Sequence, residues 1–264
     1  MIPKEPILLL LILLCQMMLY SHNEEKMHIN EEQTNIIYSV DFEQKEAFPA
    51  FVSTQTATPW GLQIVESPVY EGKKAARFEL RDSDPENQNG TRAEISFPGF
   101  DNKANSERWY AFAIYFPRKD YDADNSDEVI SQWHQGGKAT PSLCIRTRNN
   151  KLRLRINTRP KGKEVIEMGA IEREKWQYYV IHVKHSATAS GLVEIWRNGV
   201  LLVNHSGANM YDLSSGVFHT PKWKLGVYKS SWNGDAKTKA HKRVLYFDAI
   251  SIGNEHASLA EMKR

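Results

Sequence analysis

The chain alternates apolar and polar residues in one run after another, and this period of two constrains its fold more than any other feature. Such alternation is typical of a β-strand that buries one face and exposes the other. The runs that show it are 37–42, 76–80, 93–97, 110–116, 152–156, 179–183, 192–196, 223–227 and 244–252. We expect about a dozen strands and no helix before a short one near 256–263.

Turn residues separate these runs, and the pairs are Asn89-Gly90, Asn149-Asn150, Ser190-Gly191 and Asn198-Gly199. The last pair lies between the runs EIW and VLLV, which predicts a β-hairpin. No repeat unit is present, so the strands favour one all-β sandwich of two sheets. We place this domain at 36–256, after a charged linker at 22–35 and before a C-terminal tail at 257–264.

The first 21 residues have the features of an export signal. Lys4 precedes the apolar run ILLLLILL at 7–14, and polar residues resume at Ser21, so the run is shorter than a membrane-spanning helix requires. Cys15 leaves a lipid anchor as an alternative to a cleaved signal, and a retained membrane anchor is a third. Each alternative predicts a secreted, periplasmic or cell-surface protein. If the segment that contains Cys15 is removed, Cys144 has no disulfide partner. We expect no nucleic-acid partner, for a reason of charge.

The net charge of +2 gives no strong field that would attract nucleic acid, but several strands carry basic or hydrogen-bonding side chains on their polar face. These side chains are Arg92, Glu94, Arg153, Arg155, Asn157, Lys222, Lys224 and Tyr228. A solvated sheet surface explains any one strand by itself. Their joint occurrence favours a groove that binds a polyanion.

Three short segments carry the candidate chemistry: TRAE at 91–94, QWH at 132–134 and KWKLGVYK at 222–229. The spacing places Gln132 and His134 on one face of a strand. It also places Lys224 and Tyr228 on one face, with Gly226 between them. A glycine inside a strand marks the close approach of a ligand or of another backbone, or a bend or bulge.

In this order the segments resemble the heparin lyase I and glucuronan lyase group of jelly-roll polysaccharide lyases. They are also similar to the R-x-E, Q-I-H and K-A-G-V-Y motifs of alginate lyases. The runs KWQYYVIHVK at 175–184 and GLVEIWRNG at 191–199 extend the resemblance over about 36–255. It implies a concanavalin-like jelly roll of two antiparallel sheets with a concave substrate groove. It further implies a carbon–oxygen lyase that leaves a 4,5-unsaturated uronate end. We expect a monomer that needs no cofactor for catalysis.

The chemistry of β-elimination agrees with the roles that the resemblance implies. Loss of the C5 proton of a uronate builds negative charge on its carboxylate, which Arg92 and Gln132 can stabilise as donors. His134 can act as the base at neutral pH. Tyr228 can protonate the leaving oxygen, or act as the base where cations such as Lys224 favour its phenolate. The sequence leaves open which of the two residues is the base.

The same interpretation adds residues that bind substrate or metal. We expect substrate contacts from Glu94, Arg153, Arg155, Asn157, Lys222 and Trp232, although packing explains Trp232 equally well. Acidic residues of the first and last strands, Asp41, Glu43 and Asp248, predict a structural calcium ion, and solvation of a sheet edge is the alternative. The acidic run YDADNSD at 121–127 is interpreted as a flexible loop over the cleft.

Two other functions remain open. A non-catalytic carbohydrate-binding jelly roll needs the basic face but not the Arg92, Gln132, His134 and Tyr228 set. A glycoside hydrolase needs paired carboxylates, and no E-x-D-x-x-E strand is present. Among lyase substrates, glucuronan, alginate and heparin-like chains all fit, and the modest basic charge favours an unsulfated glucuronate polymer.

Overall fold

The computed structural model describes residues 34–100, 106–137, 139–158, 162–214 and 216–264. The predicted signal and nearly all of the predicted linker lie outside this part of the chain. Within it, no helix is long and apolar enough to cross a membrane.

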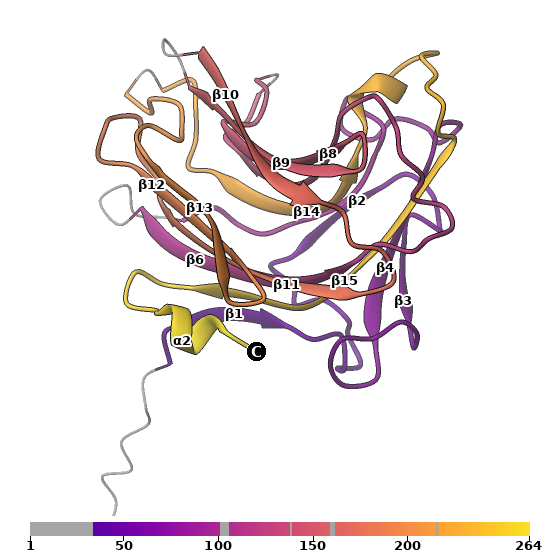
Figure 1. Cartoon of the computed structure of the whole chain (residues 1–264), viewed down its shortest axis with the longest axis horizontal. Helices are drawn as coiled ribbons and strands as arrows, with labels where there is room; N and C mark the ends of the chain where they lie inside the picture. The colour runs from indigo at the N-terminus through magenta and orange to yellow at the C-terminus, as the bar shows by residue number, and fades with distance from the viewer. Residues whose placement is uncertain (1–33, 101–105, 138, 159–161, 215) are drawn as a thin grey trace, which may run out of the picture. The chain divides into compact units, whose positions relative to one another are not determined.

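Two antiparallel sheets lie one above the other (Figure 1), which confirms the predicted jelly-roll sandwich. Sheet A has eight strands, in the order β13 (Val200–Ser206), β12 (Leu192–Arg197), β11 (Trp176–Lys184), β6 (Glu107–Tyr115), β15 (Lys242–Gly253), β4 (Ala75–Arg81) and β3 (Leu62–Val65), with β1 (Ile36–Val40) also paired to β15. Sheet B has seven strands, in the order β10 (Gly162–Ala170), β9 (Lys151–Thr158), β8 (Leu143–Arg148), β7 (Glu128–His134), β14 (Lys222–Tyr228), β5 (Arg92–Ser96) and β2 (Ser53–Thr56).

The facing surfaces of the sheets enclose one hydrophobic core. Trp223 of sheet B is 1% exposed, and its ring centroid lies 4.9 Å from that of Tyr110 in sheet A. Trp133 and Leu225 of sheet B belong to the same buried cluster as Phe112 of sheet A. Each such side chain contributes roughly 1.5–3 kcal/mol when it is fully buried. Because side chains alternate along a strand, the polar partners of these residues project from the opposite face of sheet B.

Two-residue turns fix the register of two hairpins. Asn198 and Gly199 join β12 to β13 with φ values of 50° and 81°, which confirms the hairpin predicted there. Asn149 and Asn150 join β8 to β9 with φ values of 49° and 63°. Asparagine and glycine adopt positive φ at low cost, and tight hairpins need it at both central positions.

The alternation did not predict every element. Strand β10 lies at an edge of sheet B and is largely exposed, so its sequence GKEVIEMGA has little need to alternate. Strands β2 and β3 are four residues long, too short for a clear period. The segment predicted as a tail contains the short helix α2 (Leu259–Met262), and Met262 is 1% exposed in a cluster with Trp109. This segment therefore packs on the domain.

The acidic run at 121–127 is also not the loose loop that we expected. Asp124 is 4% exposed and pairs with the fully buried Lys229 at 3.2 Å and with Arg243 at 3.5 Å. Glu128 also accepts hydrogen bonds from Lys229 at 2.9 Å and from Arg243 at 2.7 Å. Their positive charges outweigh burial and hold the pKa of Glu128 below its usual range. We call Asp124, Glu128, Lys229 and Arg243 the buried ionic cluster.

Candidate active site

The register of sheet B brings the three sequence motifs together. Strand β14 lies between β5 and β7, with Tyr228 opposite Arg92 and Lys224 opposite Gln132. Residues opposite one another in an antiparallel pair project from the same face of the sheet. Lys222 is likewise opposite His134. The predicted catalytic residues therefore share one face of three adjacent strands.

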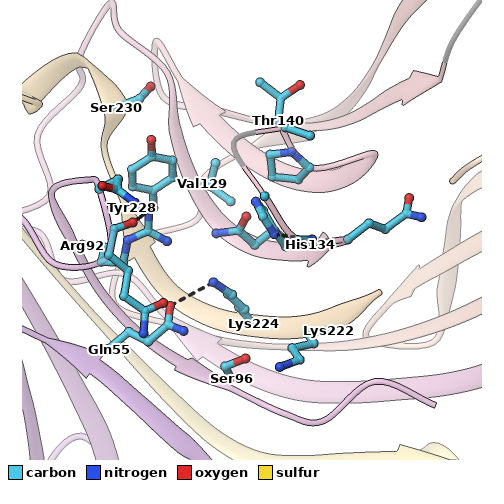
Figure 2. Close-up of a pocket in the computed structure, with 18 of the residues that line it drawn as sticks. Gln55, Arg92, Ser96, Val129, His134, Thr140, Lys222, Lys224, Tyr228 and Ser230 are labelled. Atoms are coloured by element: carbon cyan, nitrogen blue, oxygen red, sulfur yellow. Dashed lines mark hydrogen bonds between the residues drawn. The ribbon is translucent and has the colours of Figure 1, made fainter. Parts of the chain in front are cut away.

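This face forms the floor of a groove of about 930 Å³ (Figure 2). Its lining includes all five predicted catalytic residues, namely Arg92, Gln132, His134, Lys224 and Tyr228. The groove also contains residues that the sequence did not indicate, and these include Gln55, Asn89, Arg146, His219 and Ser230. Several of them lie on loops or on short strands without a motif, so no local pattern could have indicated them.

Glu94 organises two of the expected carboxylate-binding residues. It is 1% exposed, and its carboxylate accepts hydrogen bonds from Arg92 Nη1 at 3.0 Å and from Gln132 Nε2. Glu94 is not among the residues that line the groove. We expected it to contact substrate, and the structure places it instead as the residue that orients Arg92 and Gln132.

His134 is held as a neutral imidazole. Burial, together with the positive charges of Lys224 and Arg92, lowers its pKa to about 4. The backbone N–H of Gly136 donates to His134 Nδ1 at 3.0 Å. A nitrogen that accepts a hydrogen bond carries no proton in the neutral ring, so the proton of His134 is on Nε2. His134 therefore carries a donor on Nε2, and an interaction with the backbone of Ala139 partly opposes the fall in its pKa.

Lys224 lies on β14, between strand β5 with Arg92 and strand β7 with Gln132. It is 6% exposed, and its Nζ donates to Gln55 Oε1 at 2.9 Å (Figure 2). Burial lowers the pKa of Lys224, an effect that Glu94 opposes and that Arg92 reinforces. Its amine is therefore buried in the groove beside the other predicted catalytic residues.

Tyr228 has an arginine on its ring and an amide near its hydroxyl. The guanidinium carbon of Arg92 lies 4.4 Å from the ring centroid, and Asn233 Nδ2 donates to the hydroxyl at 3.4 Å. Both contacts hold the phenol in position over the groove floor. Gly90 makes room for this arrangement, since a Cβ there would lie 2.7 Å from Cε2 of Tyr228.

Gly226 allows β14 to approach β5 closely. Its φ is 137°, and a Cβ at this position would lie 2.2 Å from the carbonyl oxygen of Ala93 on β5. The register between β14 and β7 also shifts between Leu225 and Tyr228. The sequence left several explanations of Gly226 open. The structure supports two of them, the close approach of the β5 backbone and an irregularity in β14.

The remaining predicted substrate-binding residues divide into two groups. Arg155 and Lys222 line the groove, whereas Arg153 and Asn157 are not among its lining residues. Arg153 pairs with Asp127, and Asn157 Nδ2 donates to the Tyr211 hydroxyl at 2.9 Å.

Trp232 is not a surface on which a sugar can stack. It is 1% exposed, and its Nε1 donates to Thr238 at 3.0 Å. The packing alternative is therefore correct, and the stacking interpretation is wrong, because a ring without exposed surface offers no face to a ligand.

The three acids proposed for calcium accept backbone hydrogen bonds. Asp248 accepts from the N–H groups of Tyr70 at 2.9 Å and Glu71 at 3.2 Å. Glu43 accepts from two backbone N–H groups, and Asp41 accepts from that of Glu43 at 3.2 Å. In the part of the chain that the structure describes, no three His, Cys, Asp or Glu residues gather as a metal site. These contacts do not supply a shared oxygen cage, and calcium stays a prediction.

Comparison with known proteins agrees with this geometry. The family model described as polysaccharide lyase matches residues 30–251. The crystal structure of the endo-β-1,4-glucuronan lyase from the fungus Trichoderma reesei is similar, with a TM-score of 0.63 and 18% identity over 81% of this chain and 98% of that one. No curated protein sequence matches the chain.

Two binding domains of toxins share the fold over about half of their length. The binding domain of Paraclostridial Mosquitocidal Protein 1 has a TM-score of 0.55 and 13% identity, over 86% of this chain and 51% of that one. The binding domain of Botulinum Neurotoxin DC has a TM-score of 0.54 and 12% identity, over 85% and 48%. These structural likenesses show the sandwich fold alone. The family match, by contrast, covers nearly the whole domain, and the chain belongs to the polysaccharide lyase family.

Proposed function

We propose that this protein is an exported lyase that cleaves an unsulfated glucuronate polymer by β-elimination and leaves a 4,5-unsaturated uronate end. One observation carries the proposal. Donors suited to a carboxylate, Arg92 and Gln132, lie on the same groove floor as the imidazole of His134 and the phenol of Tyr228. The signal-like segment at 1–21 supports export.

The substrate carboxylate binds where Arg92 and Gln132 converge. Glu94 occupies Nη1 of Arg92, while Nε of Arg92 is buried without a partner among the described residues. A carboxylate provides the acceptor that this nitrogen lacks. These donors become more valuable as the C5 proton leaves, because negative charge then moves onto the carboxylate.

Tyr228 serves as both base and acid in this proposal. Its phenolate takes the C5 proton, the C5–H electron pair forms the C4–C5 double bond, and the C4–O4 bond breaks. The phenol then returns the proton to O4 of the leaving sugar. His134 assists as a donor, because its Nδ1 lone pair is engaged by Gly136 and its Nε2 carries the proton.

The assignment of both proton transfers to Tyr228 restricts the configuration of the sugar at C5. One residue can remove H5 and also protonate O4 only if the two atoms lie on the same side of the ring, as they do in glucuronate. In a C5 epimer the two lie on opposite sides, and a separate base is needed. The donor state of His134 therefore supports glucuronate, and the ion pairs of Arg92 with Glu94 and of Arg146 with Asp127 support a polymer without sulfate.

The pH dependence of the reaction tests the state of His134. Because its pKa is about 4, His134 is neutral throughout the range from pH 5 to pH 8. We expect kcat/KM to show no acidic limb near pH 6.5, the ordinary pKa of histidine. The part of the profile that depends on His134 should fall only as the pH approaches about 4, where Nδ1 gains a proton and loses the hydrogen bond from Gly136.

The control for this profile is His134→Asn measured on the same polymer. The limb that the variant retains belongs to the substrate carboxylates, and the limb that it loses belongs to His134. An acidic limb near pH 6.5 in the wild-type protein, absent from the variant, would contradict the neutral imidazole.

A panel of uronate polymers tests the substrate. It should contain glucuronan, alginate and a heparin-like chain, each followed by the ultraviolet absorbance of the new double bond. We expect the highest kcat/KM on glucuronan. Faster cleavage of the sulfated chain would disprove the proposed substrate while leaving the family assignment intact.

A further inference from the structure

We propose that Arg155 binds a second carboxylate, that of a uronate next to the one being cleaved, so that the enzyme requires consecutive uronates. The inference rests on the proposed function and adds a specificity-determining residue to it. It starts from a buried guanidinium in the groove that has no counter-ion in the part of the chain that the structure describes.

The sheet places Arg155 at a defined distance from the catalytic residues. Gln132 on β7 is opposite Cys144 on β8, and Cys144 is opposite Arg155 on β9. The three residues thus form one row across the strands and share the groove face. Two strand spacings separate Gln132 from Arg155, which is about 10 Å. A chain that crosses the strands from the catalytic carboxylate toward β9 brings a neighbouring sugar to Arg155.

Arg155 differs from Arg146 and Arg153 in having no ion-pair partner among the residues that the structure describes. It is 8% exposed, and its Nε and Nη2 are buried without a hydrogen-bond partner among the described residues. Arg153 pairs with Asp127, and Arg146 Nε lies 3.4 Å from the same carboxylate. A buried charge without a partner is costly, so an anion that enters the groove at this point supplies a missing interaction.

The ligand chemistry follows from the guanidinium. Its parallel N–H groups match the two oxygens of a carboxylate. A single unpaired arginine is suited to one anionic group per sugar. A polymer in which uronates alternate with neutral sugars presents no carboxylate at one of the two positions, and it loses one interaction in every binding register.

Partial chemical reduction of glucuronan provides the test, because it converts a chosen fraction of carboxylates to alcohols at random. If cleavage needs two neighbouring carboxylates, the initial kcat/KM of the wild-type protein falls with the square of the remaining carboxylate fraction. In Arg155→Gln we expect KM on intact glucuronan to rise about ten- to hundredfold with little change in kcat. We also expect its kcat/KM to fall only linearly with the carboxylate fraction.

The matched control is Arg148→Gln, which removes an exposed cation near the end of β8, outside the groove. It should keep the wild-type KM and the squared dependence. Arg155→Lys keeps the charge without the parallel donors, so its KM should lie between those of wild type and Arg155→Gln. Thermal melting of each variant identifies any that fail to fold, and the lysine variant then carries the comparison.

The outcomes separate this inference from the function on which it rests. If wild type cleaves glucuronan and Arg155→Gln keeps both its KM and its squared dependence, the second carboxylate position is wrong and the proposed function stands. If Arg155→Gln loses activity only toward sulfated chains, Arg155 binds sulfate and the inference is also wrong. If wild type cleaves no glucuronate polymer, the proposed function fails and the inference fails with it.

Discussion

Replacing Tyr228 by Phe should lower kcat on glucuronan by about 10⁴-fold, with KM within a few-fold of the wild-type value. The phenol oxygen is the only atom removed, and in the proposed mechanism it both takes the C5 proton and protonates the leaving sugar. The cation contact between the Tyr228 ring and Arg92 at 4.4 Å persists in the variant. Carboxylate binding by Arg92 and Gln132 should therefore remain.

Two measurements accompany this prediction. Binding of glucuronan to Tyr228→Phe, measured by calorimetry, should match that of wild type and show that the groove is intact. Tyr115→Phe, on strand β6 of the other sheet, is the matched control and should retain full activity. A Tyr228→Phe protein whose kcat lies within tenfold of wild type would rule out Tyr228 as the proton carrier.

The second large effect is on stability. Replacing Lys229 by Met should lower the free energy of unfolding by about 3–5 kcal/mol, because a buried ion pair that loses one partner leaves uncompensated charge. Lys229 is fully buried, and its Nζ lies 2.9 Å from Glu128 and 3.2 Å from Asp124. For a domain of this size the change corresponds to a fall in Tm of roughly 6–20 °C.

Lys237→Met is the control for Lys229→Met. Lys237 is about half exposed and lies 3.8 Å from Asp82, a surface pair of the kind that contributes about 1 kcal/mol or less. The Tm of Lys237→Met should therefore differ little from that of wild type. Equal Tm values for the two variants would show that Lys229 does not stabilise the domain through the buried ionic cluster.

The strands and the gathering of the motif residues could be predicted from sequence because both depend on local periodicity. A period of two assigns each side chain to a face, and it correctly placed Gln132 with His134 and Lys224 with Tyr228. The hairpin at Asn198-Gly199 was equally accessible, since its turn chemistry is local. Edge strand β10 could not be predicted in this way, because an exposed strand has no need to alternate apolar and polar residues.

Interactions between distant parts of the chain could not be predicted in the same way. Glu94 and Gln132 are 38 residues apart, and only the sheet register makes one the partner of the other. Periodicity likewise cannot distinguish Arg153 from Arg155, which share a face. Asp127 pairs with the first, while Nε and Nη2 of the second have no partner among the described residues. Trp232 was misplaced because an aromatic side chain after a strand fits a sugar platform and a packed core equally well.

The most direct test of the central claim is the structure of the chain ends that the enzyme produces from glucuronan. NMR of the products, together with an assay of reducing ends, should find one 4,5-unsaturated glucuronate for every new reducing end. New reducing ends without the unsaturated sugar would mean that water cleaves the glycan and would contradict β-elimination at Tyr228.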